Sequence, residues 1–373
     1  MTLRRCVALL ACVAVLSACG TAAASPATPA PRPNEQFNQI VAGARSELEL
    51  TVSWAPGFLD VGQEMRRFTD GFNKQYGLKL SVTSKTGLAL PESAARTIDE
   101  FRRGAKSSTD IVIGTEAEIN EMARAGALLS EPWQAWVKGL DNLKLIAAGG
   151  VAIQIQTRMP GITYNSTRLT GASVPKSLGD LLKPQYRGRI ATTSSTALFE
   201  RLALPEVWGQ ERTVQYVRAL APQIGGIVNC GDEDRVAKGD FDVLVYDCGS
   251  ARTNQMKAKG TLIGWSEPSD GALLGYLYMG VPKNAAHPNA AKLWINYMLS
   301  REAQDIMYEQ EFADHHLLAG SRTFAEVDKA TKSGVKFYEL NTDVVQTDEN
   351  RGGSKSVGPL LQSIIREALA ARR

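Results

Sequence analysis

Asp110-Ile111-Val112-Ile113-Gly114 is the stretch that decides the fold class, because three apolar β-branched residues stand between a polar residue and a glycine. A short apolar run with these boundaries predicts a strand that is buried on both faces. Upstream, residues 48–54 alternate apolar and polar side chains and predict another strand. Residues 78–82 alternate in the same way.

Helical spacing separates these strands. Apolar side chains recur at helical intervals in residues 37–44 and 61–72, and again around residues 98–101. The resulting order, strand–helix–strand–helix–strand, predicts a parallel sheet covered by helices. A second α/β set follows, with expected strands at residues 151–155, 162–165, 189–192, 226–229, 241–247, 261–265 and 273–281. Further helices are expected at residues 197–204, 214–220, 290–299, 302–308 and 360–370, and around residue 236.

Length and composition agree with this pattern. The chain has 373 residues, enough for two domains of ordinary size, and its 44% hydrophobic and 22% charged residues are typical of globular proteins. Basic residues number 42 against 39 acidic residues, and Arg4 and Arg5 lie at the extreme N-terminus. This near balance argues against a broad nucleic-acid surface, so any binding partner must be recognised at a local site.

The N-terminal residues carry an export signal. A basic segment precedes an apolar run that extends to Ala18 and is too short for a transmembrane helix. Leu16-Ser17-Ala18-Cys19 matches the bacterial lipobox, which predicts a signal peptide over residues 1–18 and lipidation at Cys19. Residues 19–36 are rich in alanine and proline and predict a tether. The alternative is a plain signal peptide cleaved near Ala24.

Two cysteines remain once Cys6 and Cys12 leave with the signal and Cys19 takes the lipid. Cys230 and Cys248 follow the expected strands at 226–229 and 241–247, which a short helix separates. If these parallel strands are neighbours, about 4.8 Å apart, the cysteines lie within the usual disulfide range of about 4.4–6.8 Å. The bridge would close a loop of about 18 residues, worth roughly 3 kcal/mol. The alternative is a pair of free thiols, which an oxidising compartment disfavours.

Enzyme motifs are absent from the sequence. It contains no G-x-S-x-G, no phosphate-binding G-x-x-x-x-G-K-[ST], no G-x-G-x-x-G and no H-E-x-x-H. His315 and His316 are adjacent, and adjacent side chains on a helix or strand point apart, so a surface or helix-end position is expected rather than a zinc site. Asp232 and Asp234 fit the acidic first turn of a helix. We therefore expect a protein that is not an enzyme and has no cofactor and no metal.

Five segments in a consistent order resemble a known family. They are 40–52, 110–113, Gly161-Ile162-Thr163-Tyr164-Asn165, the stretch from Pro175 to Ile190 with Tyr186-Arg187-Gly188-Arg189, and the stretch from Val281-Pro282-Lys283 to His287-Pro288-Asn289-Ala290-Ala291. From about residue 40 to residue 299 the chain resembles the family 1 extracellular solute-binding proteins of ABC importers. It is most similar to the branch that includes ferric-iron, polyamine and phosphonate binders.

The resemblance implies a type II-like periplasmic-binding-protein fold. It has two α/β lobes, each a mainly parallel sheet flanked by helices, with a ligand cleft between them. The first lobe would comprise residues 37–155 and 280–325, and the second lobe residues 156–279 and 326–373, with crossings near residues 151–165 and 274–281. The implied function is capture of a small polar solute for an ABC permease and its ATPase. The protein would be a monomer, exported to the periplasm or another extracytoplasmic space and held at the membrane by its lipid, with no nucleic-acid partner.

Ligand-binding residues are expected in loops that follow strands, where open α/β sheets bind ligands. The candidates are Ser53, Trp54, Gly57, Thr115, Glu116, Thr193, Ser194, Ser195, Tyr246, Asp247, Arg252 and Tyr276.

Several of these candidates have a second interpretation. Hydroxyls at the start of a helix, as at residues 193–195, favour an anion but also cap the helix. Trp54 either stacks on a ligand or ends a buried face, and Asp247 either pairs with a ligand amine or caps the next helix. Arg252 would pair with a carboxylate or phosphate, and alternation brings Tyr276 to one face with Tyr278.

The sequence departs from the iron-binding members of the family at two places. Those members use paired adjacent tyrosines, often with a histidine from the first loop, whereas Tyr246 is followed by Asp247-Cys248-Gly249 and residues 55–60 contain no histidine. Ferric iron prefers several hard oxygen ligands, so we expect a small polar organic solute instead. A secreted enzyme, or a binding-protein-like sensor on the same fold, is the alternative function.

Overall fold

The structure is a computed structural model that describes residues 33–54, 63–137, 140, 143–193, 197–350 and 354–372. The chain divides into Met1–Arg32 and the compact unit Pro33–Arg373. The expected signal peptide, Cys19 and most of the expected tether therefore lie outside the described residues. Within the described ranges, no helix has the length and apolar character needed to cross a bilayer.

The first lobe is built on the strands that the opening motif predicts. Its strands are β1 (Glu49–Trp54), β2 (Ser81–Thr86) and β3 (Val112–Gly114). β1 pairs with β2 in parallel from Glu49↔Ser81 to Trp54↔Thr86, and a parallel bridge joins Val52 to Ile111 beside β3. The strand–helix–strand–helix–strand prediction is therefore confirmed.

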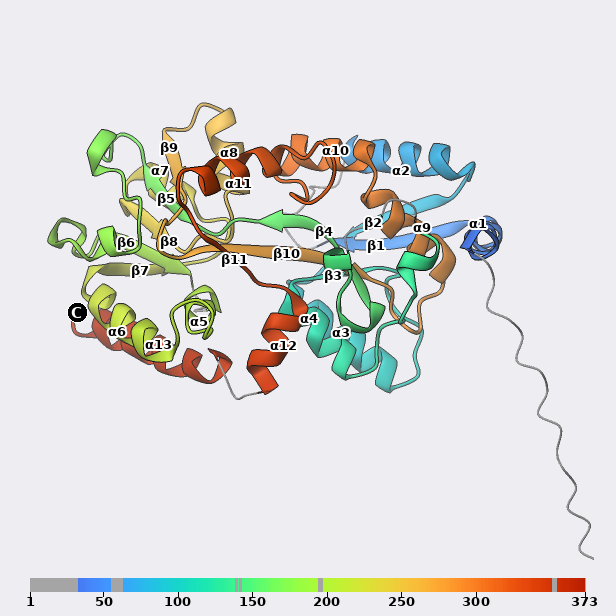
Figure 1. Ribbon diagram of the computed structural model, residues 1–373, viewed down its shortest axis with the longest axis horizontal. Helices are drawn as coiled ribbons and strands as arrows, with labels where there is room; N and C mark the ends of the chain where they lie inside the picture. The colour runs from blue at the N-terminus through green and yellow to red at the C-terminus, as the bar shows by residue number, and fades with distance from the viewer. Residues whose placement is uncertain are drawn as a thin grey trace, which may run out of the picture. The chain divides into compact units, whose positions relative to one another are not determined.

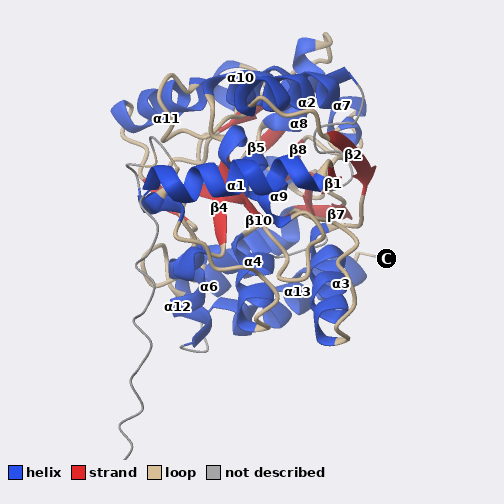
Figure 2. Cartoon of the chain, turned by 90° about the vertical axis from the view of Figure 1, so that its right-hand side faces the viewer, coloured by secondary structure: helices blue, strands red, loops and turns tan. Residues whose placement is uncertain are grey.

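Helices enclose these strands on two sides (Figures 1 and 2). They are α1 (Pro33–Glu47), α2 (Gln63–Tyr76), α3 (Leu90–Arg102), α4 (Glu116–Arg124), α9 (Pro288–Met298) and α10 (Arg301–Glu311). The core between them is aromatic: the Phe72 ring lies 5.2 Å from the Trp294 ring and 6.0 Å from the Tyr297 ring, centroid to centroid. Segments that are far apart in the sequence, residues 33–124 and 288–311, therefore pack around one core, as the predicted discontinuous first lobe would require.

Two long strands cross between the lobes. β4 (Ala152–Arg158) and β10 (Ala272–Gly280) pair in antiparallel register from Ala152↔Gly280 to Arg158↔Gly275. β10 also pairs with β3 at one end and, in parallel, with β11 (Phe337–Glu339) at the other. In Figure 1 these strands run through the middle of the described unit. The crossings expected near residues 151–165 and 274–281 coincide with them.

The second lobe contains a mixed sheet in the order β7-β6-β8-β5-β9. Its strands are β5 (Ile162–Asn165), β6 (Ile190–Thr193), β7 (Ile224–Val228), β8 (Val243–Val245) and β9 (Ile263–Ser266). β6 is parallel to both β7 and β8, whereas β5 is antiparallel to β8 and β9. The sheet is therefore parallel at its β7-β6-β8 side, where the helical crossovers occur.

Alternation along these strands creates two apolar faces. Ile190 and Val243 pack in one cluster, and their neighbours Ala191 and Leu244 pack in another on the opposite face. Helices α5 (Ala197–Leu202), α6 (Gln210–Leu220) and α13 (Ser354–Ala370) contribute to the first cluster, and α7 (Asp234–Lys238) and α8 (Ala251–Ala258) to the second. Helices thus cover both faces of the sheet.

The C-terminal segment touches both lobes. After α11 (Arg322–Lys332), helix α12 (Thr342–Asn350) packs against α4 of the first lobe, while α13 packs against α5 and α6. The Asn120 amide donates to the Thr342 carbonyl at 2.9 Å. Residues 326–373 were expected to belong wholly to the second lobe, and the lobe boundaries remain a prediction. Short 3-10 turns occupy Trp133–Ala135, Leu143–Leu145, Ala148–Gly150, Gly171–Ser173, Gly179–Leu182, Pro184–Tyr186 and Ala221–Gln223.

The histidine pair contradicts the sequence-based expectation. His315 and His316 are buried rather than exposed, and their rings stack on each other with centroids 5.5 Å apart. The periodicity argument fails because the helix ends at Glu311 and the next residue, Phe312, with a φ of 51°, turns the chain out of helical geometry. His315 Nε2 lies 3.0 Å from the Gln154 side-chain oxygen, and His316 Nδ1 lies 2.8 Å from the Thr157 hydroxyl. Burial lowers the pKa of both imidazoles, which fits uncharged packing against the crossing strand.

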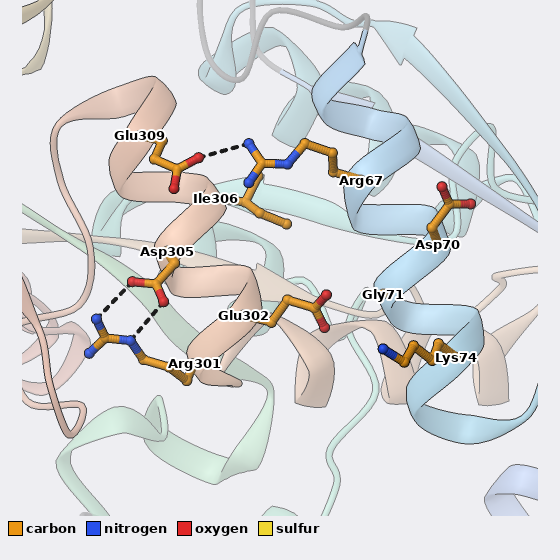
Figure 3. A pocket seen from close by; sticks show the side chains of 9 residues that line it. All are labelled: Arg67, Asp70, Gly71, Lys74, Arg301, Glu302, Asp305, Ile306 and Glu309. Atoms are coloured by element: carbon orange, nitrogen blue, oxygen red, sulfur yellow. Dashed lines mark hydrogen bonds and ion pairs between the residues drawn. The ribbon is translucent and has the colours of Figure 1, made fainter.

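A charged groove lies between α2 and α10 on the first lobe (Figure 3). Its volume is about 740 Å³, and Figure 3 shows the two ion pairs at its rim, Arg67 with Glu309 and Arg301 with Asp305. Gly71 at its floor permits a close approach, because a Cβ there would lie 2.1 Å from the Tyr297 hydroxyl. Gly71 thus lets α2 pack closely against Tyr297 of α9.

Candidate functional site

Charged residues from both lobes and from a crossing strand meet near the carboxyl ends of β3, β6 and β8. Together with Cys248, whose carbonyl oxygen accepts a hydrogen bond from one of them, we call these residues the inter-lobe site. Its members are Glu116, Glu118, Arg158, Arg201, Asp247 and Cys248. Glu116 and Glu118 lie in the first turn of α4, directly after β3. Arg201 lies on α5, which follows β6, and Cys248 follows β8. The position agrees with the rule that open α/β sheets bind ligands beyond their strand ends.

The start of α4 is held by its own side chains. The Thr115 backbone N–H donates to Glu118 Oε2 at 2.8 Å, and its hydroxyl donates to the same oxygen at 2.5 Å. This is a capping box, and Thr115 is fully used by it. Glu118 is only half-buried, and within the described part of the chain its second carboxylate oxygen makes no hydrogen bond.

Glu116 forms a buried ion pair across the two lobes. Arg201 Nη2 lies 3.1 Å from Glu116 Oε1, and both side chains are less than a tenth exposed. Burial raises the pKa of the Glu116 carboxyl, while the Arg201 guanidinium acts in the opposite direction. The two lobes therefore meet at a charge pair that neither lobe satisfies alone.

Arg158 ends β4 and reaches the same place. Its guanidinium donates to the Cys248 carbonyl oxygen, and no carboxylate of the described residues forms an ion pair with it. Burial lowers the pKa of this arginine, and the nearby carboxylates of Glu116, Glu118 and Asp247 counteract that shift. Sequence analysis missed Arg158, although its place at the end of an alternating segment was the available signal.

Asp247 is committed to the backbone. It is fully buried, and its oxygens accept hydrogen bonds from Gly161 N–H at 2.8 Å, Gly249 N–H at 3.1 Å and the Thr163 hydroxyl at 2.8 Å. Burial raises the pKa of its carboxyl, and these donors oppose the shift. Asp247 therefore fixes the start of β5 to the loop after β8, which neither of its expected roles describes.

The Cys230–Cys248 disulfide is present, with a Cα–Cα distance of 5.7 Å. The expected reason was partly wrong, because β7 and β8 are not neighbours and β6 lies between them. Strands two places apart are separated by about 9.6 Å. The cysteines meet because each lies beyond its strand, two residues past Val228 and three past Val245, so the two loops reach across the end of β6.

The other candidates are spread over cores and surfaces. Three of them are buried aromatic residues, each 1% exposed: Trp54, Tyr246 and Tyr276. Trp54 lies in the core of the first lobe, and Tyr276 stacks on His315. The Tyr246 hydroxyl donates to the Gly271 carbonyl at 2.6 Å. Trp54 thus occupies the buried position that was one of its two expected roles.

Ser53 pairs with Lys85 in the edge ladder, Thr193 is buried at the end of β6, and Arg252 is exposed on α8. Gly57, Ser194 and Ser195 lie outside the described residues. Of the predicted set, Glu116 and Asp247 both act electrostatically on Arg158, and Thr115 caps the helix that carries Glu116. In the ranges that the structure describes, no group of three or more histidine, cysteine or acidic residues is placed to hold a metal ion.

Comparison with known proteins identifies the family. Residues 136–346, more than half of the chain, match the family described as bacterial extracellular solute-binding protein. The chain belongs to this family. The resemblance inferred from the sequence is thereby confirmed.

Relatives of this solute-binding protein include the Fe(3+)-binding periplasmic protein of Serratia marcescens. That protein is 24% identical over 301 residues, which cover 75% of this chain and 86% of the relative. The substrate-binding protein of an ABC transporter from Agrobacterium tumefaciens has a similar structure, with a TM-score of 0.66, 18% identity and coverage of 87% and 96% of the two chains. Iron-bound HitA from Pseudomonas aeruginosa gives a TM-score of 0.64 at 21% identity, covering 85% and 99%. These structures are two-lobed binding proteins, which confirms the predicted fold class.

Removing Arg201 should open the lobes. Arg201→Met would leave the Glu116 carboxylate buried without its partner, a loss of about 3–5 kcal/mol that separation of the lobes relieves by hydration. We expect a larger radius of gyration of the ligand-free protein in small-angle X-ray scattering. The double variant Glu116→Gln with Arg201→Met should reverse most of the change. Arg218→Met, whose side chain is exposed on α6, should have no effect. Identical scattering from Arg201→Met and the unmodified protein would contradict an inter-lobe role.

Glu233, inside the disulfide loop, should make stability depend on pH. It is 1% exposed, its Oε2 has no hydrogen-bond partner, and burial raises its pKa to about 7 from the ordinary 4.5. Folding therefore favours the protonated form, so this contribution is complete below pH 4.5 and is lost as pH rises through about 7. Glu233→Gln should match the unmodified protein near pH 4.5 and exceed its stability by at most about 3 kcal/mol at pH 8. Urea unfolding between pH 4.5 and pH 8 measures the difference in stability between Glu233→Gln and the unmodified protein, with the exposed Glu206→Gln as control. A stability difference that does not change with pH would refute the role of Glu233.

Proposed function

We propose that this protein is the solute-binding component of an ABC import system. It captures a small polar organic solute between its lobes and delivers it to a membrane permease driven by an ATPase. The observation that carries the proposal is the convergence of Glu116, Arg158 and Arg201 from the first lobe, a crossing strand and the second lobe. Charges that meet only between two lobes are suited to sensing a ligand by closure.

An organic solute fits the described residues better than ferric iron. The relative from Serratia marcescens binds Fe(3+), as its name states. In this chain Tyr246 is buried with its hydroxyl bonded to a backbone carbonyl, and Cys248 is held in a disulfide. The Glu116 carboxylate is paired with an arginine. Ferric iron needs several hard oxygen ligands that are free to bind it, and these groups are already engaged.

A binding role also fits better than catalysis. The named relatives and neighbours are binding proteins. The strongest candidate for acid–base chemistry, Asp247, is fully buried and accepts three hydrogen bonds from the protein. A general acid or base must reach the proton that it transfers. The carboxylates of the inter-lobe site are thus placed to recognise charge.

Lipid anchoring at Cys19 would hold the protein, as a monomer, beside its permease. The lipobox and the proline-rich segment that follows it support this arrangement. The lipid would retain the protein at the membrane while its binding lobes remain in an extracytoplasmic space.

Solute should close the lobes without being altered. Ligand bound only by the folded state stabilises by about 2.7 kcal/mol at a hundredfold excess over its dissociation constant, so the thermal midpoint should rise. A panel of amino acids, polyamines, carboxylates, sugars and ferric citrate tests this by thermal shift. Small-angle scattering should show a smaller radius with the solute that binds, and NMR should recover that solute unchanged. Chemical turnover would contradict a binding function, and stabilisation by ferric citrate alone would contradict the organic class.

Replacement of the lipobox cysteine should release the protein from the membrane. Because Cys19 carries the proposed lipid, Cys19→Ser should move the protein from the membrane fraction to the soluble fraction and abolish incorporation of a labelled fatty acid. Cys230→Ser with Cys248→Ser serves as the control that removes cysteines but keeps the anchor. Equal fatty-acid labelling of Cys19→Ser and the unmodified protein would refute lipidation at this residue.

A further inference from the structure

Arg158 has hydrogen-bonding capacity that the protein does not use. A guanidinium carries five N–H donors and stays charged in proteins. In the described structure it makes one hydrogen bond, to the Cys248 carbonyl, and no ion pair. The side chain of Arg158 is only partly buried, and a partly desolvated charge is stabilised by an ionic partner. Arg158 thus lacks an ionic partner within salt-bridge distance among the described residues, and a bound anion would supply one.

The nearby carboxylates do not meet this need. Asp247 accepts three hydrogen bonds from its own lobe, and Glu116 is paired with Arg201. Glu118 uses one oxygen to cap α4. These three carboxylates and that of the buried Glu311 are all close enough to affect the pKa of Arg158, yet none forms an ion pair with it among the described residues. The surroundings of Arg158 thus carry negative charge that is not paired directly with it.

Glu118 presents the complementary requirement. Its Oε2 is bound to Thr115, while the other oxygen makes no hydrogen bond to any residue that the structure describes, and the side chain is half-buried. A carboxylate oxygen with unused acceptor capacity next to the buried Glu116 favours a donor that carries positive charge. The inter-lobe site therefore offers one unpaired cation and one available carboxylate in close proximity.

We propose that the solute is a small zwitterion whose carboxylate pairs with Arg158 and whose ammonium group pairs with Glu118. This inference rests on the proposed binding function and names its solute class. A dicarboxylate would be repelled by Glu116, Glu118 and Asp247, and a diamine would be repelled by Arg158. A neutral sugar would leave Arg158 without an ionic partner. Only a solute with both charges satisfies both side chains.

A four-carbon series separates these classes by charge alone. The probes are 4-aminobutyrate, succinate, 1,4-diaminobutane and 1,4-butanediol, added to a mixture that also contains the twenty amino acids, glucose and ferric citrate. The purified full chain is dialysed to equilibrium against the mixture, and mass spectrometry measures which compounds are enriched with the protein. We expect enrichment of zwitterions only, led by one or a few of them.

Variants then assign the two groups. For the best zwitterion, Arg158→Gln and Glu118→Gln should each weaken binding about 100-fold, since each removes a charge-assisted contact. Arg158→Lys keeps the charge but loses the planar paired donors of the guanidinium. It should therefore bind about tenfold more tightly than Arg158→Gln. Arg158→Gln should also shift the preference toward the diamine, and Glu118→Gln toward the dicarboxylate. These gains would be visible even if a variant were less stable.

Matched controls are available on the same surfaces. Glu121→Gln lies one turn further along α4, and Arg96→Gln lies on α3; both side chains are exposed and should leave affinity unchanged. Enrichment of only a dicarboxylate, a diamine, a sugar or ferric citrate would overturn the zwitterion but not solute binding. Unchanged zwitterion affinity in Arg158→Gln would overturn it as well. Enrichment of no compound would overturn both this inference and the proposed function.

Discussion

The antiparallel ladder between β4 and β10 is the constraint on which the rest of the structure depends. Both strands run between the lobes, so they fix how the strand ends of the two sheets face each other (Figure 1). The helices that follow β3 and β6, α4 and α5, come close enough for Glu116 and Arg201 to meet at 3.1 Å. β4 also delivers Arg158 to the same place, because the strand ends there. The inter-lobe site is therefore a consequence of the crossing, and no single lobe contains it.

The two sides of this site differ in how firmly they are fixed. On the second lobe, Asp247 binds the backbone of Gly161, and the disulfide holds Cys248, whose carbonyl receives Arg158. The Glu116–Arg201 pair is the charged contact that spans the lobes at the site, and a buried ion pair contributes little net stabilisation after desolvation. Because closure without solute is weak, the binding energy of the solute is available to drive the closed state. A receptor that must also release its cargo requires this balance.

Much of the fold was predictable because burial leaves a periodic trace in the sequence. The strand at 48–54 and the long strand at 273–281 correspond to β1 and β10, whose side chains alternate or are buried on both faces. Helix α4 was missed because only Ile119 and Met122 mark its apolar face. The stacked imidazoles of His315 and His316 depend on the turn at Phe312, which no periodicity encodes. The disulfide was predicted from export, cysteine count and the position of both cysteines after strands, whereas the strand order β7-β6-β8 was not predicted.

The candidate site was harder to predict, because sequence indicates where a side chain stands and not whether it is available. Tyr246, Asp247 and Thr115 do follow strands, yet each spends its polar atoms on the protein's own backbone or on a helix cap. Arg158 was overlooked at the end of a crossing strand, and it retains unused donors beside a border of carboxylates. Availability depends on the full set of hydrogen bonds around a group, which only tertiary structure provides. Ligand specificity in such a cleft is therefore better sought among the charges that folding leaves unpaired than among the residues that strand order places nearby.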